Sequence, residues 1–202
     1  MPSTHAVKLV ILGRDGVLNV YREDHVKAPE EWQPEPGALE AVARLNHAGW
    51  HTVVATNQAG IGRGMIDMAS INAVHAHMNR QLMALGGRID AVFFCPHTPE
   101  EDCDCRKPRP GMMLDIGRRY GVTLSEVPMV TDTLRDLEAA AAAGCPPHLV
   151  LTGRAAGLDE ATLARYVEKV PATRVHRDLG AFADWLLARD HVADSGAGAL
   201  DA

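Results

Sequence analysis

The sequence predicts an α/β protein, a Rossmann-like three-layer sandwich built on a mainly parallel sheet. Short apolar segments rich in β-branched residues alternate with longer segments of helical periodicity, a pattern that implies strand–helix–strand crossovers. Unusual polar residues follow directly after several of the predicted strands. Because ligands of open α/β sheets bind beyond the carboxyl ends of the strands, we expect a functional site at that edge.

The first half of the chain predicts two strands with a helix between them. Residues 8–12 form a short apolar run that ends at a glycine, as expected of a buried parallel strand. Pro36 and Gly37 precede a helix over 38–48, whose apolar stripe stops at another glycine. Residues 51–55 are apolar and β-branched, and predict the second strand.

The rest of the chain continues this alternation. A long helical pattern ends at Gly86-Gly87, and an apolar β-branched segment follows it. The predicted elements, in order, are a helix over 68–85, a strand over 89–94, a helix over 111–120, a strand over 127–130, a helix over 134–143, strands over 148–151 and 173–176, and a helix over 179–188.

Composition and charge limit the possible functions. The chain has 202 residues, a formal net charge of −6 and no run of Lys or Arg longer than two. A general nucleic-acid-binding protein would show a basic surface, so this class is excluded. No apolar run approaches the roughly 20 residues that span a bilayer, and the first residues do not resemble a secretory signal. We therefore expect a cytoplasmic protein that contacts neither membrane nor nucleic acid.

Three of the four cysteines cluster around one histidine. Cys95 and His97 are followed, after five residues, by Cys103 and Cys105. Three thiolates and one imidazole form a closed tetrahedral set for zinc, whereas incidental thiols would rarely crowd into a polar loop. Since four protein ligands leave no position for water, the predicted Zn²⁺ is structural.

A second constellation combines residues that follow four predicted strands. Gly13 and Asp15 follow the first, Thr56 and Asn57 the second, Lys107 the third and Asp132 the fourth. Each of these residues alone would be interpreted as an ordinary surface residue or as part of a turn. Together they supply a hydroxyl, an ammonium and carboxylates, the groups needed to hold a phosphoryl group and a divalent cation.

These segments identify a resemblance to a known family. RDGVLN at 14–19, TNQAGIGRG at 56–64, CPH at 95–97, CDCRKPRPGM at 103–112 and the Asp132 segment are similar to the haloacid dehalogenase superfamily, and within it to the D-glycero-D-manno-heptose 1,7-bisphosphate phosphatases. The resemblance covers about residues 7–155. It implies a single domain over 1–190 with a minimal cap and a zinc loop at 95–109, followed by a tail over 191–202 that we expect to be disordered.

The resemblance also implies roles for individual residues. Asp15 would be the general acid and base, Thr56 and Lys107 would stabilise the phosphoryl group, and Asp132 with the backbone carbonyl of Asp15 would bind catalytic Mg²⁺. Arg106 would recognise the second phosphate. The remaining substrate-binding positions are Tyr21, Asp24, Asn57, Gln58 and Ala59, the last in place of a more usual serine. The family's small sugar phosphate substrate and monomeric state carry over as expectations.

Two positions depart from the family. The family's nucleophilic aspartate, which also binds magnesium, corresponds to Gly13, and a glycine before the magnesium-binding aspartate corresponds to Thr131. A missing nucleophile elsewhere costs about 10⁶ in kcat, so we expect impaired turnover. Asp15 acting as the nucleophile or direct attack by water are alternatives. A β-branched Thr131 would crowd the backbone or shift Asp132.

Three functions remain open at this stage: a magnesium-dependent phosphatase that removes the 7-phosphate of heptose bisphosphate on the way to the lipopolysaccharide core, a silent sugar-phosphate-binding paralogue or altered chain, and a histidinol-phosphate-type phosphatase.

Other polar or sulfur-containing side chains have simpler interpretations. Asp136 is expected to steady its helix, Cys145 to fill space, and His47, His75 and His77 to be surface or packing residues. The methionines at 65, 68, 78 and 83 are expected in the core.

Overall fold

The computed structural model describes the backbone of residues 7–197 and the side chains of residues 7–190. It contains one six-stranded sheet with the strand order β3-β2-β1-β4-β5-β6, in which every pairing is parallel. The strands are β1 (Leu9–Leu12), β2 (His51–Asn57), β3 (Ala91–Cys95), β4 (Met129–Thr131), β5 (Pro147–Val150) and β6 (Arg174–His176). This confirms the predicted α/β class and parallel sheet.

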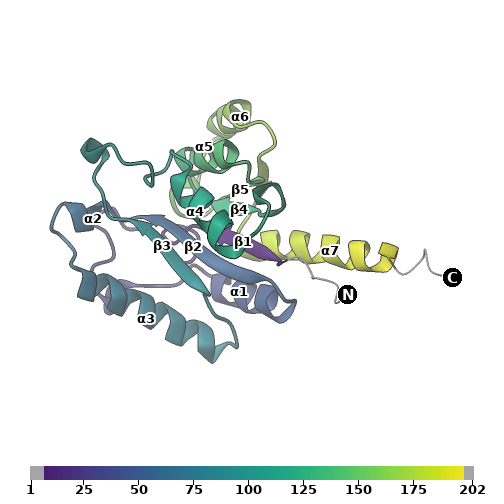
Figure 1. Ribbon diagram of the computed structural model, residues 1–202, viewed down its shortest axis with the longest axis horizontal. Coiled ribbons are helices and arrows are strands. Elements are labelled where there is room, and N and C mark those ends of the chain that lie inside the picture. Colours follow the sequence, from purple (N-terminus) through teal and green to yellow (C-terminus); the bar gives the residue numbers. More distant parts are fainter. Residues whose placement is uncertain (1–6, 198–202) are drawn as a thin grey trace.

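Helices cover both faces of this sheet (Figure 1). They are α1 (Ala38–His47), α2 (Ala59–Gly62), α3 (Met68–Ala84), α4 (Gly111–Tyr120), α5 (Leu134–Ala143), α6 (Glu160–Lys169) and α7 (Leu179–Ala197), with short 3₁₀ segments η1 (Pro29–Glu31), η2 (Pro99–Glu101), η3 (Leu124–Glu126) and η4 (Gly153–Ala155). No helix within residues 7–197 is long and apolar enough to cross a membrane.

The alternation of side chains along β1 builds the two cores. Val10 and Leu12 point to one face, where buried residues of α1, α3 and α7 surround them. Leu9 and Ile11 point to the other face, against α4 and α5. All four residues are at most 1% exposed, so β1 is buried on both faces, as parallel central strands are.

Helix starts and ends follow local chemistry. The side chains of Asp67, Thr133 and Asp159 accept backbone N–H groups in the first turns of α3, α5 and α6. Gly121 and Gly144 end α4 and α5 in the left-handed conformation. The predicted boundaries of α4 and α5 agree with the structure, and those of α1 and α3 differ by one residue.

The structure differs from the sequence expectations in several segments. β2 continues through Thr56 and Asn57, because both pair with β3. α2 and α6 were not predicted: α2 is only four residues long, and α6 packs on the core through partly buried side chains, Leu163 and Tyr166. Helix α7 continues to Ala197, since no proline or glycine lies between 181 and 195. The expected tail at 191–202 therefore overlaps this helix in part, and residues 198–202 lie outside the described residues.

Two histidines pair beneath α7. The Nδ1 atom of His148 on β5 lies 2.9 Å from Nε2 of His176 on β6, and the two rings stack with centroids 5.2 Å apart. Phe182 and Trp185 of α7 contact the His148 ring. Burial, reinforced by the neighbouring His176, lowers the pKa of His148 to about 3. His148 therefore stays neutral in the folded protein at every ordinary pH.

We predict that acidification from pH 7.5 to 5 lowers the free energy of unfolding by about 2 kcal/mol through His148. In the unfolded chain this imidazole gains a proton near its ordinary pKa of 6.5, whereas in the folded protein it gains one only near 3. The stabilisation is thus present above pH 6.5 and is lost as the pH falls. Urea unfolding at both pH values would measure it.

The His148→Gln variant removes this proton uptake, so its unfolding free energy should change less between the two pH values. His47 is exposed on α1, and the His47→Gln variant serves as the matched control. It should lose as much unfolding free energy between the two pH values as the unaltered chain. A His148→Gln protein that lost as much stability on acidification as the unaltered chain would contradict the assignment.

Candidate active site

The polar residues at the end of β2 and those that follow β1, β4 and β5 meet at the carboxyl edge of the sheet, where the sequence predicts a site. They form one cleft together with a lysine from the loop that follows β3. The lining residues are Gly13, Arg14, Asp15, Thr56, Asn57, Lys107, Asp132, Arg135, Asp136 and Arg154. The cleft therefore brings together all six residues of the second constellation, Gly13, Asp15, Thr56, Asn57, Lys107 and Asp132.

Asp15 is fixed by three partners. Arg14 donates to both of its carboxylate oxygens, at 2.9 and 3.1 Å to Nη2. The amides of Asn19 and Gln58 donate to it at 3.0 and 3.1 Å. Burial acts to raise the pKa of Asp15, but the charge of Arg14 and these hydrogen bonds hold it below its ordinary value. Asp15 is therefore held as a charged carboxylate, and its lowered pKa makes it a weaker base than a free aspartate.

Thr56 and Asn57 use their side chains differently. The buried Thr56 hydroxyl accepts from Gln58 at 3.0 Å, which links it to Asp15 through one amide. The Asn57 amide donates to the backbone carbonyl of Lys107 at 3.0 Å and accepts from its backbone N–H at 3.2 Å. Asn57 thus holds the backbone of Lys107, and the Gln58 amide holds the Asp15 carboxylate.

Lys107 is a buried cation with a buried counter-charge. Only 2% of its side chain is exposed, and its ammonium donates to the Ala55 carbonyl at 2.7 Å and to the Asp136 carboxylate. Asp136 also accepts from Arg135 Nε at 3.0 Å. Burial would raise the pKa of Asp136, but Lys107 and then Arg135 lower it to about 2. An ammonium has three donors, so one N–H of Lys107 remains for a ligand in the cleft.

Asp132 is a buried carboxylate in a backbone cage. Its Oδ2 accepts the backbone N–H of Arg154 at 2.8 Å. A Cβ at Gly16 would come within 2.0 Å of that oxygen, and one at Gly153 would come within 2.3 Å of the Gly16 Cα. Both glycines have positive φ, so the two loops meet at Asp132 only because neither carries a side chain. Burial raises the pKa of Asp132 to about 6.

Gly13 sits at the end of β1 with its N–H donating to the Val130 carbonyl at 2.8 Å. A Cβ added here would meet the Val17 Cγ2 at 3.0 Å and the Val130 carbonyl oxygen at 3.5 Å. Thr131, the other departure from the family, is the last residue of β4, and its hydroxyl accepts the Thr133 N–H at 3.3 Å. Asp132 lines the cleft.

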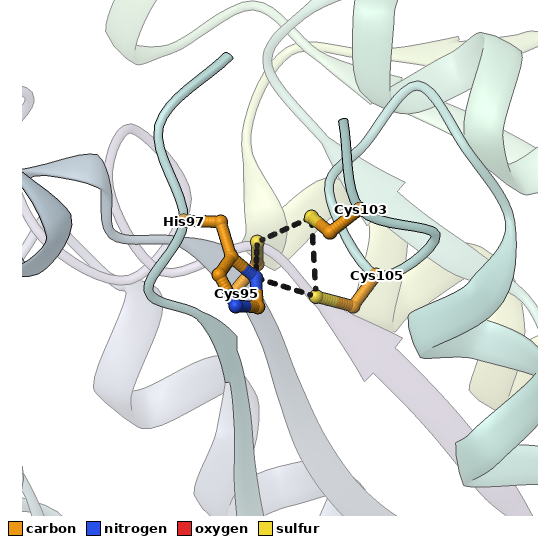
Figure 2. A group of neighbouring side chains, drawn as sticks. All are labelled: Cys95, His97, Cys103 and Cys105. Carbon is orange, nitrogen blue, oxygen red and sulfur yellow. Dashed lines mark hydrogen bonds between the residues drawn. The ribbon is translucent and has the colours of Figure 1, made fainter. Parts of the chain in front are cut away.

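The four predicted zinc ligands converge at the end of β3 and in the loop that follows it (Figure 2). Their ligand atoms all lie within 4.8 Å of one another. The Cys95–Cys103 and Cys103–Cys105 sulfur distances are 3.5 Å, and His97 Nδ1 lies 3.3 Å from the Cys105 sulfur. Tetrahedral zinc with Zn–S bonds of about 2.3 Å would place sulfurs roughly 3.8 Å apart. The cluster can therefore hold a tetrahedral cation.

If this cluster holds structural zinc, pure protein should contain close to one zinc per chain, lost in the Cys103→Ser/Cys105→Ser variant. Loss of the metal should lower the free energy of unfolding by several kcal/mol, because no bound cation would then hold the four ligand side chains together. Metal analysis and thermal unfolding with and without a chelator would measure both effects. The matched control is Cys145→Ser, since this cysteine lies outside the cluster. Full stability without metal would contradict the prediction.

Four predicted substrate residues lie away from the cleft floor. The Arg106 guanidinium donates to the His97 carbonyl at 3.2 Å and lines a second cleft of about 210 Å³ next to Lys107. Tyr21 lies under the Arg154 guanidinium. Asp24 is exposed and pairs with Arg22 and Lys27, while Ala59 is buried at the start of α2. The structure does not place Asp24 or Ala59 in the cleft with Gly13.

Several residues of the site were not predicted from the sequence. The Arg14 side chain is 1% exposed and contacts His75 of α3, with Nη1 3.2 Å from Nε2. Burial, and then the charge of Arg14, lowers the pKa of His75 to about 4, so the neutral ring accepts from the arginine. Arg135 and Arg154 also line the cleft. The rule on strand ends could have found Arg154, because it follows β5 closely.

The simpler interpretations of other side chains are confirmed only in part. Asp136 lies in the first turn of α5, where Thr133 is the residue whose side chain caps the helix. Cys145 is buried among apolar residues, as expected. Of the four methionines assigned to the core, only Met78 is buried. Met65, Met68 and Met83 are 46–70% exposed, because each falls on the outward side of its segment.

Comparison with known proteins identifies the class and then the family. A family model described as HAD-hydrolase-like matches residues 104–181. The chain is thus a phosphohydrolase-type member of the haloacid dehalogenase superfamily. It is 52% identical over 182 residues to the D-glycero-beta-D-manno-heptose-1,7-bisphosphate 7-phosphatase of Bordetella bronchiseptica, covering 90% of this chain and 98% of that protein. The chain belongs to the heptose 1,7-bisphosphate 7-phosphatase family.

Other relatives agree with this placement. The Neisseria meningitidis serogroup A protein of the same name is 43% identical over 182 residues, with 90% of this chain and 95% of that protein covered. The crystal structure of the Bordetella bronchiseptica enzyme, complexed with magnesium and phosphate, has a TM-score of 0.85 and covers 91% of this chain and 99% of that chain. The Burkholderia thailandensis enzyme has a TM-score of 0.68 at 49% identity, with 89% of this chain and 98% of that chain covered.

The donor set at Asp132 fits Mg²⁺, the cation that the family implies. Magnesium prefers oxygen ligands and usually combines one or two carboxylates with waters and substrate phosphate. Asp132 is 3% exposed and its nearest side-chain cation, Arg154 Nη1, is 3.8 Å away. Lys107 and Arg135 pair with Asp136 instead. A buried carboxylate without a close counter-charge, whose pKa rises toward 6, is a site where a cation lowers the free energy.

We predict that Asp132→Asn stabilises the metal-free protein at pH 7.5 and abolishes its response to magnesium. The raised pKa corresponds to roughly 3 kcal/mol of unfavourable burial of the charge above pH 6, which the neutral amide avoids while still accepting the Arg154 N–H. Thermal unfolding with and without millimolar Mg²⁺ would measure both effects. Glu126 lies outside the cleft, and Glu126→Gln is the charge-matched control. An undiminished magnesium response in Asp132→Asn would contradict the assignment.

Proposed function

We propose that the cleft binds the 7-phosphate of D-glycero-D-manno-heptose 1,7-bisphosphate, and that Gly13 makes its hydrolysis far slower than in the relatives. One observation carries this proposal: Thr56, Lys107, Asp15 and Asp132 remain assembled and hydrogen-bonded around a residue without a side chain. The relatives named as 7-phosphatases, one of them solved with magnesium and phosphate, support the substrate.

The chain's own residues account for binding and for proton transfer. The free N–H of Lys107 and the Thr56 hydroxyl are placed to donate to phosphoryl oxygens, whose negative charge the ammonium neutralises. Asp15 would hold a proton for the leaving sugar oxygen once a ligand anion in the cleft raises its pKa. The partners of Asp15, among them Gln58 and Asn19, fix the orientation of its carboxylate.

Magnesium would be held by Asp132 and the backbone carbonyl of Asp15, where it would neutralise charge on the phosphoryl group. With Gly13 the site lacks a second carboxylate ligand. We therefore expect weaker magnesium binding than in a chain with aspartate at this position. The zinc cluster would act separately, by holding the loop that carries Arg106 and Lys107.

The missing carboxylate bears on the chemical step. A phosphoryl transfer through an aspartyl phosphate needs a carboxylate in line with the scissile bond. In a comparable concerted set, removing the nucleophile cost about 10⁶ in kcat, which corresponds to roughly 8 kcal/mol. Asp15 is a poor substitute, because Arg14, Asn19 and Gln58 hold its carboxylate in place. Direct attack by water would leave a slow residual rate.

A silent sugar-phosphate-binding protein of the same fold is the second candidate, and it is favoured by Gly13 alone. A histidinol-phosphate-type phosphatase has no observation in its favour beyond the shared zinc loop, whereas Arg106 beside the second cleft suits a ligand with two phosphates. The monomeric state, the cytoplasmic location, the single domain over 1–190 and the place in lipopolysaccharide synthesis stay predictions.

We predict that Gly13→Asp raises magnesium-dependent phosphate release from heptose 1,7-bisphosphate by at least 10³-fold, because it restores the nucleophile and a magnesium ligand. The new Cβ would press on Val17 Cγ2, so Gly13→Asp/Val17→Ala is made in parallel to give the aspartate room. Released phosphate is measured under saturating substrate. The control Gly13→Asn has nearly the same shape but no nucleophilic carboxylate, and should stay at the rate of the unaltered chain.

The outcomes separate the candidates. Activity confined to the aspartate variants supports a phosphatase cleft silenced at one residue. If the unaltered chain already releases phosphate at the rate of Gly13→Asp, another group performs the attack and the impairment is refuted. If neither chain acts on heptose 1,7-bisphosphate while both bind it, the binding-protein candidate holds.

A further inference from the structure

We propose that Arg154 is a phosphate-binding residue of the cleft, held in position by the ring of Tyr21; this inference rests on the proposed function. Arg154 lies in η4, immediately after β5, and lines the cleft beside Gly13, Asp15 and Asp132. Its ligand would be the oxyanion of a phosphomonoester or of inorganic phosphate, bound together with Lys107.

The backbone of Arg154 forms a hydrogen bond, whereas its side chain is free to bind a ligand. The backbone N–H donates to Asp132 Oδ2 at 2.8 Å and belongs to the cage around that carboxylate. The guanidinium makes only a distant ion pair, with Nη1 3.8 Å from the same oxygen. Within residues 7–190 no hydrogen bond of the Arg154 side chain is formed, so its five N–H donors are available to a ligand.

The other cations of the cleft are already engaged. Arg14 is bound to Asp15, Arg135 to Asp136, and Lys107 to Asp136 and the Ala55 carbonyl. An oxyanion in this cleft therefore meets one free N–H of Lys107 and the whole fork of Arg154. In the strand order, Lys107 approaches from the β2 side of β1 and Arg154 from the β5 side, so the two cations flank the position of Gly13.

Tyr21 supplies the support that a positioned arginine needs. The guanidinium carbon of Arg154 lies 3.7 Å from the centroid of the Tyr21 ring, which is within the range of a cation–π contact. Stacking covers one face of the guanidinium and leaves its edge, where the N–H donors lie, for the ligand. A side chain that is 40% exposed would otherwise lose much rotamer freedom on binding.

The test measures the affinity for inorganic phosphate in the presence of Mg²⁺, by calorimetric titration of the unaltered chain and its variants. Arg154→Met should weaken phosphate binding at least tenfold, because charge-assisted hydrogen bonds are lost while the backbone bond to Asp132 stays. Arg154→Lys should be intermediate, since it keeps the charge but not the fork. Tyr21→Leu should weaken binding three- to tenfold, whereas Tyr21→Phe, which keeps the ring face, should bind like the unaltered chain.

The control variant is Arg118→Met, which removes one positive charge from an exposed site on α4, where Arg118 pairs with Asp115. It should bind phosphate within twofold of the unaltered chain. Thermal unfolding of every variant reports whether the fold is intact. If Arg154→Met does not fold, the phosphate affinities of Arg154→Lys and Tyr21→Leu are compared with that of the unaltered chain instead.

A folded Arg154→Met or Arg154→Lys protein that binds phosphate within twofold of the unaltered chain overturns the inference. The proposed function survives that result, because the unaltered chain still binds. If the unaltered chain itself binds no phosphate with magnesium, the proposed function fails and this inference fails with it.

Discussion

The site depends on the buried ion pair between Lys107 and Asp136. Both side chains are almost fully excluded from water, and each charge alone would cost several kcal/mol there. Their pairing fixes the first turn of α5 against the loop that follows the zinc cluster, and the Ala55 carbonyl and Asn57 amide tie the same lysine to β2. One residue thus connects three elements, and the cleft takes its shape from their meeting point.

Most charged groups of the cleft lie close to an opposite charge. Arg14 neutralises Asp15, and Lys107 with Arg135 neutralises Asp136. Asp132 is the exception, which agrees with its raised pKa and with a cation as its natural partner. Because no pair includes position 13, an uncharged residue there leaves the other pairs intact. The charge pairs of the cleft therefore do not depend on the side chain at position 13.

The alternation of strands and helices predicted the parallel sheet, and the strand-end rule predicted where Asp15, Thr56, Lys107 and Asp132 meet. The cysteine spacing predicted the cluster at Cys95. Other features depend on tertiary contacts that no local pattern encodes. The sequence could not show that Asn57 would clamp Lys107, that Gln58 would serve Asp15, or that Arg154 would stack on Tyr21. Helix α6 was missed although Leu163 and Tyr166 pack on the core, because both are only partly buried. The exposed methionines were misassigned because a hydrophobic side chain does not by itself show whether it faces the core or the solvent.

The three glycines around the cleft differ in what they permit. Gly16 and Gly153 touch at the level of the backbone, so any side chain at either would push the β1 and β5 loops apart and open the cage around Asp132. Gly13 has negative φ, and the first neighbour of an added Cβ is a methyl group of Val17. A larger residue at position 13 therefore needs only a small side-chain adjustment, whereas a substitution at either of the other two glycines would require the loops themselves to be rebuilt.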